Sequence, residues 1–267
     1  MADLGATRWL ITGANGTIGS GLWEHLRGRV AGLVLADVEA PTDLREDEVG
    51  LACDLGDPAS IDTVAGICAD VDGVIHLAGI PSEAPYDELL RVNALGTYHV
   101  LEGMRRGGAR RLVYASSNHV TGLHPTAEEL DDTSTVRPDG LYGASKAAAE
   151  AVARMYADKF GLSVIILRIG SFSEHPSSDR EGATWLSHGD AWRAFEAAMT
   201  TDADFALCYG VSANTNRVWS LEPGRAIGFE PLDDAADHLG EQASPEPEEP
   251  QAGEQFASQD FTLKHTP

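Results

Sequence analysis

The sequence predicts an α/β fold built on a doubly wound parallel sheet and completed by a small C-terminal region. Short apolar runs alternate with segments whose apolar residues recur at helical spacing, and this alternation is typical of a parallel sheet with helices on both faces. The alternation covers the first two-thirds of the 267 residues and then stops. A glycine-rich turn follows the first apolar run, at a position where such sheets bind ligands.

The predicted strands are short and almost wholly apolar, as expected for strands that are buried on both faces of a sheet. They are Arg8–Thr12, Leu33–Ala36, Val49–Cys53, Gly73–His76, Arg111–Ala115 and Ser163–Arg168. Helices are predicted between them, at Pro58–Ala69, Tyr86–Arg106 and Tyr142–Phe160. Residues 1–170 are therefore predicted to form one cofactor-binding core that includes the helix beginning at Tyr142.

The pattern changes after Gly170, and residues 171–240 are predicted to form a small substrate-binding region. It begins with a polar loop, residues 171–182, which is long enough to have a function of its own. Ser187 followed by Asp190 is typical of a helix start. A further strand at Phe205–Tyr209 and a short helix at Glu222–Ile227 complete this region.

Residues 241–267 are predicted to form an acidic tail. Proline and glutamate dominate its first part, which is too polar to fold alone. The stretch Phe256–Leu263 regains apolar character, and we expect either a frayed end or an arm that docks on a neighbouring subunit. We also expect the protein to be a homo-oligomer.

The composition argues against several classes of protein. The 19 Lys and Arg residues against 42 Asp and Glu residues give a net charge of −23, so neither nucleic-acid nor membrane partners are expected. No run of about 18 apolar residues and no basic signal region is present, and we expect a cytoplasmic protein. Cys53, Cys68 and Cys208 lack the spacing of a disulfide framework or a metal cluster, and no metal is expected. The scarcity of lysine fits either a halophilic protein or a GC-rich genome.

Residues 12–19, with the sequence TGANGTIG, follow the first predicted strand and open a helix. The glycines of this stretch allow a tight turn, a close approach to a pyrophosphate and close packing of helix on strand. The helix N-terminus then faces the negative charge. The alternative is a tight turn without a ligand. We expect cofactor contacts from Gly13, Asn15, Gly16, Thr17, Ile18 and Gly19.

Asp37 ends the second predicted strand, 18 residues beyond Gly19. A carboxylate at this position accepts hydrogen bonds from the adenosine ribose hydroxyls and repels a 2′-phosphate, which favours NAD over NADP. The alternative role of Asp37 is that of a loop cap. Further cofactor contacts are expected after the third and fourth strands, from Asp54, Leu55, Leu77, Ala78 and Gly79.

Tyr142 and Lys146 share one face of a predicted helix because they are four residues apart. A nearby ammonium lowers the pKa of a phenol, so we expect Tyr142 to act as a general base near neutrality. Lys146 can also hold the nicotinamide ribose. Ser117 follows the fifth strand and supplies a hydroxyl at the same edge of the sheet. Together these residues predict a dehydrogenase site, whereas the alternative for the pair is a solvated helix face.

Five features in this order resemble the extended short-chain dehydrogenase/reductase family, whose core is Rossmann-like. They are the glycine turn, Asp37, HLAG at residues 76–79, SSN at residues 116–118 and the YxxxK motif. The resemblance covers roughly residues 7–235. It implies that Ser117, Tyr142 and Lys146 are catalytic and that Asn93, next to the cofactor, steadies the active-site helix.

Shorter stretches resemble the uronate dehydrogenases of this family, which oxidise C1 of galacturonate or glucuronate to an aldarolactone with NAD. They are SSNHV (116–120), RPD (137–139), LRIGS (167–171), ATWLS (183–187) and YGVSAN (209–214). This resemblance implies that Ser117, Asn118 and His119 contact sugar hydroxyls. It also implies that Ser171 lines the pocket and that Arg180 binds the carboxylate of a sugar acid.

Two further features concern the substrate. The guanidinium of Arg180 suits a carboxylate or a phosphate, because it can make two parallel hydrogen bonds. The alternative is a surface arginine paired with Asp179 or Glu181. Pro81 departs from the family, in which a serine faces the substrate, and the neighbouring Ser82 is expected to compensate.

The predicted function is NAD-dependent oxidation of a hexuronic acid at C1. A second candidate is an NAD-dependent aldose or glucose 6-phosphate dehydrogenase of the same family, with Arg180 binding phosphate. Nucleotide-sugar epimerases and dehydratases are usually longer than this chain. A non-catalytic NAD-binding module would have no need of Tyr142 as a base.

Overall fold

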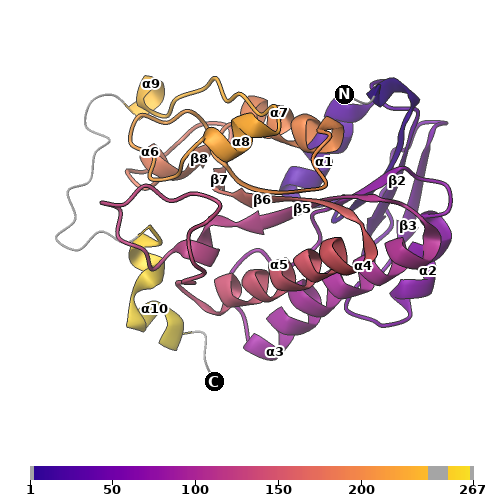
Figure 1. Ribbon diagram of the computed structural model, residues 1–267, viewed down its shortest axis with the longest axis horizontal. Helices are drawn as coiled ribbons and strands as arrows, with labels where there is room; N and C mark the ends of the chain where they lie inside the picture. The colour runs from indigo at the N-terminus through magenta and orange to yellow at the C-terminus, as the bar shows by residue number, and fades with distance from the viewer. Residues whose placement is uncertain (1–2, 240–251, 265–267) are drawn as a thin grey trace.

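The computed structural model describes residues 3–239 and 252–264 (Figure 1). Seven strands form one parallel sheet in the order β3-β2-β1-β4-β5-β6-β9. The strands are β1 (Arg8–Thr12), β2 (Gly32–Asp37), β3 (Glu48–Ala52), β4 (Gly73–His76), β5 (Arg111–Ser117), β6 (Ser163–Ile169) and β9 (Phe205–Gly210). Each predicted strand is present, and the predicted doubly wound parallel sheet is confirmed.

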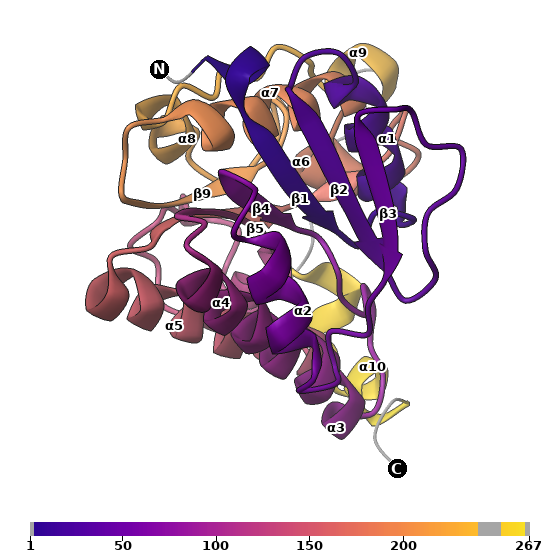
Figure 2. The ribbon, with the colours of Figure 1, turned by 90° about the vertical axis from the view of Figure 1, so that its right-hand side faces the viewer.

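Helices cover both faces of the sheet (Figure 1 and Figure 2). One face carries α1 (Thr17–Leu26), α7 (His188–Thr200) and α8 (Glu222–Ala226), and the other carries α2 (Ser60–Ile67), α4 (Gly96–Gly107) and α5 (Leu141–Phe160). Successive side chains of a strand point to opposite faces. Trp9 and Ile11 accordingly pack in the hydrophobic cluster of α1 and α7, and Leu10 packs in the cluster of α2, α4 and α5.

The helix predicted over residues 86–106 is interrupted. It consists of α3 (Tyr86–Leu89), a π-helical segment η2 (Leu90–Leu95) and α4. Within η2, the Asn93 side chain accepts the Ile80 N–H at 2.8 Å and donates to the Ile80 carbonyl at 3.2 Å and to Ser145 Oγ at 3.0 Å. Single turns of π-helix are frequent at functional sites, and this one ties the loop after β4 to α5.

The region after β6 contains more regular structure than the polar loop predicted for residues 171–182. Two short strands, β7 (Ser171–Phe172) and β8 (Trp185–Leu186), pair in parallel, with α6 (Glu181–Thr184) between them in the chain. As predicted, Ser187 begins α7, and its hydroxyl accepts the Asp190 N–H at 2.9 Å. The remaining short helical segments are η1 (Leu4–Ala6), η3 (Asn118–Thr121), α9 (Ala236–Leu239), η4 (Glu254–Ala257) and α10 (Gln259–Leu263).

The described part of the predicted tail, residues 252–264, packs against its own chain. The Ala252 N–H donates to the His124 carbonyl at 2.9 Å, and the Gly253 N–H donates to the Gly122 carbonyl at 2.7 Å. Helix α10 then lies near the N-terminal end of α5 (Figure 1). The stretch expected to fray or to dock on a neighbouring subunit thus has contacts within its own chain, and residues 241–251 lie outside the described part.

The fold is stabilised mainly by its hydrophobic clusters. No helix in residues 3–239 and 252–264 is long and apolar enough to cross a membrane.

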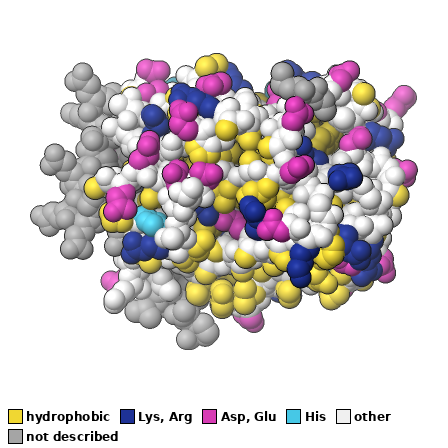
Figure 3. Space-filling view, viewed as in Figure 1, with side chains coloured by type: hydrophobic (Ala, Val, Ile, Leu, Met, Phe, Trp, Pro, Cys, Tyr) yellow, Lys and Arg dark blue, Asp and Glu magenta, His cyan; other side chains and the backbone are white. Residues whose placement is uncertain are grey.

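Apolar side chains gather over the lower part of one face, where α5 lies, and charged side chains of both signs surround them (Figure 3). Exposed ion pairs, such as Arg154 with Asp158 on α5, contribute little to stability.

Candidate active site

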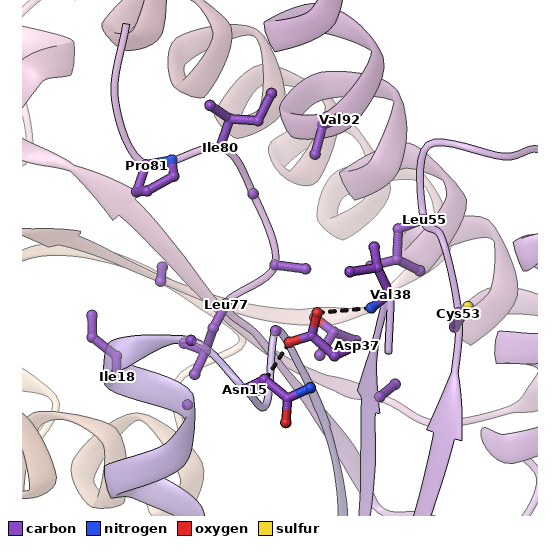
Figure 4. A pocket seen from close by; sticks show the side chains of 18 of the residues that line it. Asn15, Ile18, Asp37, Val38, Cys53, Leu55, Leu77, Ile80, Pro81 and Val92 are labelled. Carbon is purple, nitrogen blue, oxygen red and sulfur yellow. Dashed lines mark hydrogen bonds between the residues drawn. The ribbon is translucent and has the colours of Figure 1, made fainter. Parts of the chain in front are cut away.

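A cavity of about 910 Å³ lies at the carboxyl ends of β1 to β4 (Figure 4). The strand order reverses between β1 and β4, and open α/β sheets bind their ligands at such switch points. Thr12 at the end of β1 is in register with Ala36 of β2 and with His76 of β4. The residues that follow these three strands therefore emerge side by side and line one site, which is large enough for a dinucleotide.

The glycine turn brings three elements into close contact. Gly13 has φ +73°, and a Cβ atom there would lie 2.6 Å from the Ala78 nitrogen. A Cβ atom on Gly19 would lie 2.1 Å from the Gly13 carbonyl oxygen. Gly16 begins α1 without a side-chain cap, so the first N–H groups of the helix face the cavity and suit a phosphate.

Asp37 reaches the cavity from the end of β2. Its carboxylate accepts the Asn15 backbone N–H at 2.9 Å and the Val38 N–H at 2.7 Å (Figure 4). Because a carboxylate has about four acceptor positions, capacity remains for two ribose hydroxyls. Arg91, which also lines the cavity, lies 3.5 Å from Asp54. These residues fit the adenosine end of NAD.

Most residues predicted to bind the cofactor line this cavity. They are Gly13, Asn15, Gly16, Thr17, Ile18, Gly19, Asp37, Asp54, Leu55, Leu77, Ala78 and Gly79. Asn93 does not line it, because its side chain is buried in the bonds to Ile80 and Ser145. Asn93 thus joins the loop after β4 to α5, and its role in steadying that helix stays a prediction. Val38, Cys53, Arg91 and Val92 also line the cavity, and no motif in the sequence marks them.

A second cavity, of about 220 Å³, adjoins the first and shares Leu77, Gly79, Pro81 and Ala115 with it. The structure brings almost all the predicted catalytic and substrate residues to its walls. They are Ser117, Asn118, His119, Tyr142, Lys146, Ser171 and Arg180. Ser82 is exposed and lines neither cavity, because Pro81 takes the position that faces both. Phe172, which sequence reasoning missed, lines both and is marked only by its place after Ser171.

Helix α5 places Tyr142 and Lys146 in the second cavity. Glu83 accepts the Tyr142 backbone N–H at 3.1 Å and so holds the start of α5. Lys146 Nζ donates to the Ala115 carbonyl at 2.9 Å, which joins α5 to the end of β5. One turn further, Glu150 accepts hydrogen bonds from Ser116 at 2.5 Å and from Arg168 at 2.8 and 3.0 Å. This buried network fixes the catalytic helix against β5 and β6.

The predicted lowering of the Tyr142 pKa is wrong for the structure as it stands. Burial raises the pKa of Tyr142 to about 12, although a hydrogen bond with Ser117 opposes this change. Burial also lowers the pKa of Lys146 to about 8, while the nearby Glu150 carboxylate acts to raise it. Burial is the main cause for Tyr142, and Lys146 does not offset it, since its Nζ atom donates to a backbone carbonyl and lies 6.0 Å from the centroid of the Tyr142 ring.

His119 and Arg180 both contact Phe256, a residue that sequence reasoning missed. The Phe256 ring packs against His119 with 4.9 Å between ring centroids, and the Arg180 guanidinium lies 4.9 Å from the same ring. Arg180 Nη1 also donates to Ser171 Oγ at 2.8 Å. Glu181, considered as a surface partner for Arg180, accepts hydrogen bonds from Ser177. Phe256 is 137 residues from His119 in sequence, and no motif points to it.

The fold and the two cavities define a Rossmann-like dinucleotide-binding protein with a Ser–Tyr–Lys site. Among the described residues, no group of His, Cys, Asp or Glu is suited to hold a metal ion. The model of the NAD dependent epimerase/dehydratase family matches residues 9–181. The chain belongs to this family, which confirms the resemblance to extended short-chain dehydrogenases/reductases and NAD as the cofactor.

Individual relatives cover most of the chain. A uronate dehydrogenase from Pseudomonas syringae pv. tomato is 38% identical over 229 residues, which are 85% of this chain and 82% of the relative. An NAD-dependent glucose-6-phosphate dehydrogenase from Haloferax volcanii is 33% identical over 250 residues, with 85% of this chain and 94% of the relative covered. The structure of a mutant uronate dehydrogenase from Agrobacterium tumefaciens complexed with NAD has a TM-score of 0.85 and 34% identity, over 94% of this chain and 97% of that chain.

Proposed function

We propose that the protein oxidises a hexuronic acid, glucuronate or galacturonate, at C1 with NAD and releases the aldarolactone. The observation that carries this proposal is the set of side chains that line the second cavity. This cavity combines the Ser117, Tyr142 and Lys146 side chains with the guanidinium of Arg180, and it opens onto the cavity that fits NAD. The similarity to uronate dehydrogenases over 85% of the chain supports the same substrate class.

Tyr142 is the base of the reaction and Ser117 its hydrogen-bonding partner. When bound, NAD would supply the hydride acceptor at C4 of its nicotinamide ring. The Lys146 ammonium and the Ser117 hydrogen bond favour the phenolate against the effect of burial. Tyr142 then takes the proton of the anomeric hydroxyl, and Ser117 stabilises the same oxygen as negative charge develops on it.

The remaining residues orient the sugar. Arg180 binds the carboxylate at the end of the cavity that β7 and α6 form, and Ser171 steadies the guanidinium. Asn118 and His119 follow Ser117 and contact the sugar hydroxyls. Holding both ends of the substrate aligns C1 with the nicotinamide, and such alignment supplies a large share of enzymatic rate enhancement.

The second candidate is an aldose or glucose 6-phosphate dehydrogenase of the same family. It is favoured by the 33% identity to the Haloferax relative and by the equal suitability of a guanidinium for phosphate. Pro81 also favours this second candidate. Uronate dehydrogenases have a serine hydroxyl facing the substrate at this position, and Pro81 supplies none. A non-catalytic NAD-binding module is disfavoured by the convergence of Ser117, Tyr142 and Lys146 in one cavity.

The test is NAD reduction by the purified protein with glucuronate, galacturonate, glucose and glucose 6-phosphate, each at low and at molar salt. We expect rapid turnover with the two uronates and, at most, slow turnover with glucose and glucose 6-phosphate. Turnover with the phosphate or the neutral sugar in their place would refute the uronate assignment while leaving the catalytic residues standing. If none of the four sugars is oxidised and NAD still binds, the hypothesis of a non-catalytic NAD-binding module is reopened.

A further inference from the structure

A buried carboxylate lies directly behind His119. Asp139 is 6% exposed, and its Oδ2 atom is 2.7 Å from His119 Nδ1. His119 lines the second cavity, whereas Asp139 does not. The imidazole is thus held from the side away from the substrate. Among residues 3–239 and 252–264, no group makes a hydrogen bond to its other nitrogen, Nε2.

The surroundings keep both side chains in this arrangement. A Cβ atom on Gly122 would lie 1.9 Å from Asp139 Oδ2, and one on Gly253 would lie 2.1 Å from it, so two stretches of bare backbone enclose the carboxylate. The His119 carbonyl accepts the Asp139 N–H at 3.3 Å. The rings of Tyr142 and Phe256 pack edge-on against the imidazole, at centroid distances of 5.8 and 4.9 Å. The C-terminal segment therefore takes part in holding the pair.

We propose that Asp139 is a positioning residue that fixes His119 as a hydrogen-bond acceptor for one hydroxyl of the substrate. A carboxylate only accepts, so the proton of the neutral imidazole must lie on Nδ1. Nε2 then presents a lone pair that accepts a hydrogen bond from a substrate hydroxyl. When a deoxy sugar lacks that hydroxyl, Nε2 is left without a donor. A site built to bind a hydroxyl rejects the analogue that lacks it. Only the identity of the ligand rests on the proposed function, because the tautomer follows from the geometry.

The first test reads the tautomer without any substrate. Long-range proton–nitrogen NMR of the full protein labelled with ¹⁵N-histidine, at alkaline pH where imidazoles are neutral, distinguishes a protonated nitrogen from a bare one. The His119 signal is assigned from its loss in His119→Gln. We expect a protonated Nδ1 in the wild type and a mixture of tautomers in Asp139→Asn, because an amide can also donate. A protonated Nε2 in the wild type would overturn the proposal.

The second test uses uronates that each lack one ring hydroxyl. We expect one of them to be about tenfold poorer in kcat/KM for the wild type, as befits one lost hydrogen bond. The same analogue should lose much less in Asp139→Asn and in His119→Gln, while the exposed control Asp47→Asn behaves as the wild type. Equal losses on all substrates would reduce Asp139 to a structural role and overturn the proposal. If the wild type oxidises no uronate, the proposed function fails, and the NMR result still decides the tautomer.

Discussion

The proposed carboxylate-binding role of Arg180 makes a sharp prediction for Arg180→Ala. Arg180 Nη1 donates to Ser171 Oγ at 2.8 Å, and the planar fork of the guanidinium suits two parallel bonds to a carboxylate. Each such charge-assisted bond is worth about 1.5 kcal/mol. Loss of both costs about 3 kcal/mol, which corresponds to a fall of about 100-fold in kcat/KM for glucuronate.

The assay compares glucuronate with glucose, since the two sugars differ at C6. We expect Arg180→Ala to spare whatever slow oxidation of glucose the enzyme supports, and Arg180→Lys to be intermediate because it keeps the charge without the fork. The control Arg29→Ala removes a half-exposed arginine whose partner Glu196 is 3.5 Å away. If activity with glucose falls as far as activity with glucuronate, Arg180 only supports the loop around Ser171, and the reasoning is refuted.

Three further predictions test the core of the site. Tyr142→Phe should retain NAD affinity, measured by titration calorimetry, and lose about 100- to 10,000-fold in kcat, and normal turnover would remove Tyr142 from the chemistry. Gly13→Ala should abolish NAD binding or folding, because its Cβ atom would lie 2.6 Å from the Ala78 nitrogen. Burial lowers the pKa of Lys146 to about 8 in the folded state, so the unfolded state binds more protons above that pH. Stability of the protein without NAD, followed by urea denaturation, should therefore rise from about pH 8 to about pH 9.5 relative to Lys146→Met, and a constant difference would contradict the shift.

The part of the site that could be predicted from the sequence is the part that strand ends determine. Apolar runs identify the strands, and parallel strands present their carboxyl ends at one edge of the sheet. The glycine turn, Asp37 and Ser117 had to converge there. The spacing of Tyr142 and Lys146 then placed both on one helix face, directed at the same edge.

Other features depend on contacts that local sequence does not encode. Asn93, in the π-helical segment, bonds to Ile80 and Ser145, and the spacing of apolar residues does not predict such bonds. The predicted pKa of Tyr142 failed because helix spacing gives proximity to Lys146 without giving burial. The packing of Phe256 on His119 joins the C-terminal segment to a loop that follows β5.

Under the proposed function, proton transfer and carboxylate binding are assigned to different parts of the chain. Ser117 and Lys146 are held by β5 and α5, within the buried network of Glu150. Arg180 and Phe256, by contrast, come from the region after β6, outside the seven-stranded sheet. Changes in these later segments can therefore alter the group that is bound opposite C1 while the proton-transfer residues stay in place. We therefore expect substitutions around Arg180 and at Pro81, where the two cavities meet, to change the sugar that the enzyme accepts.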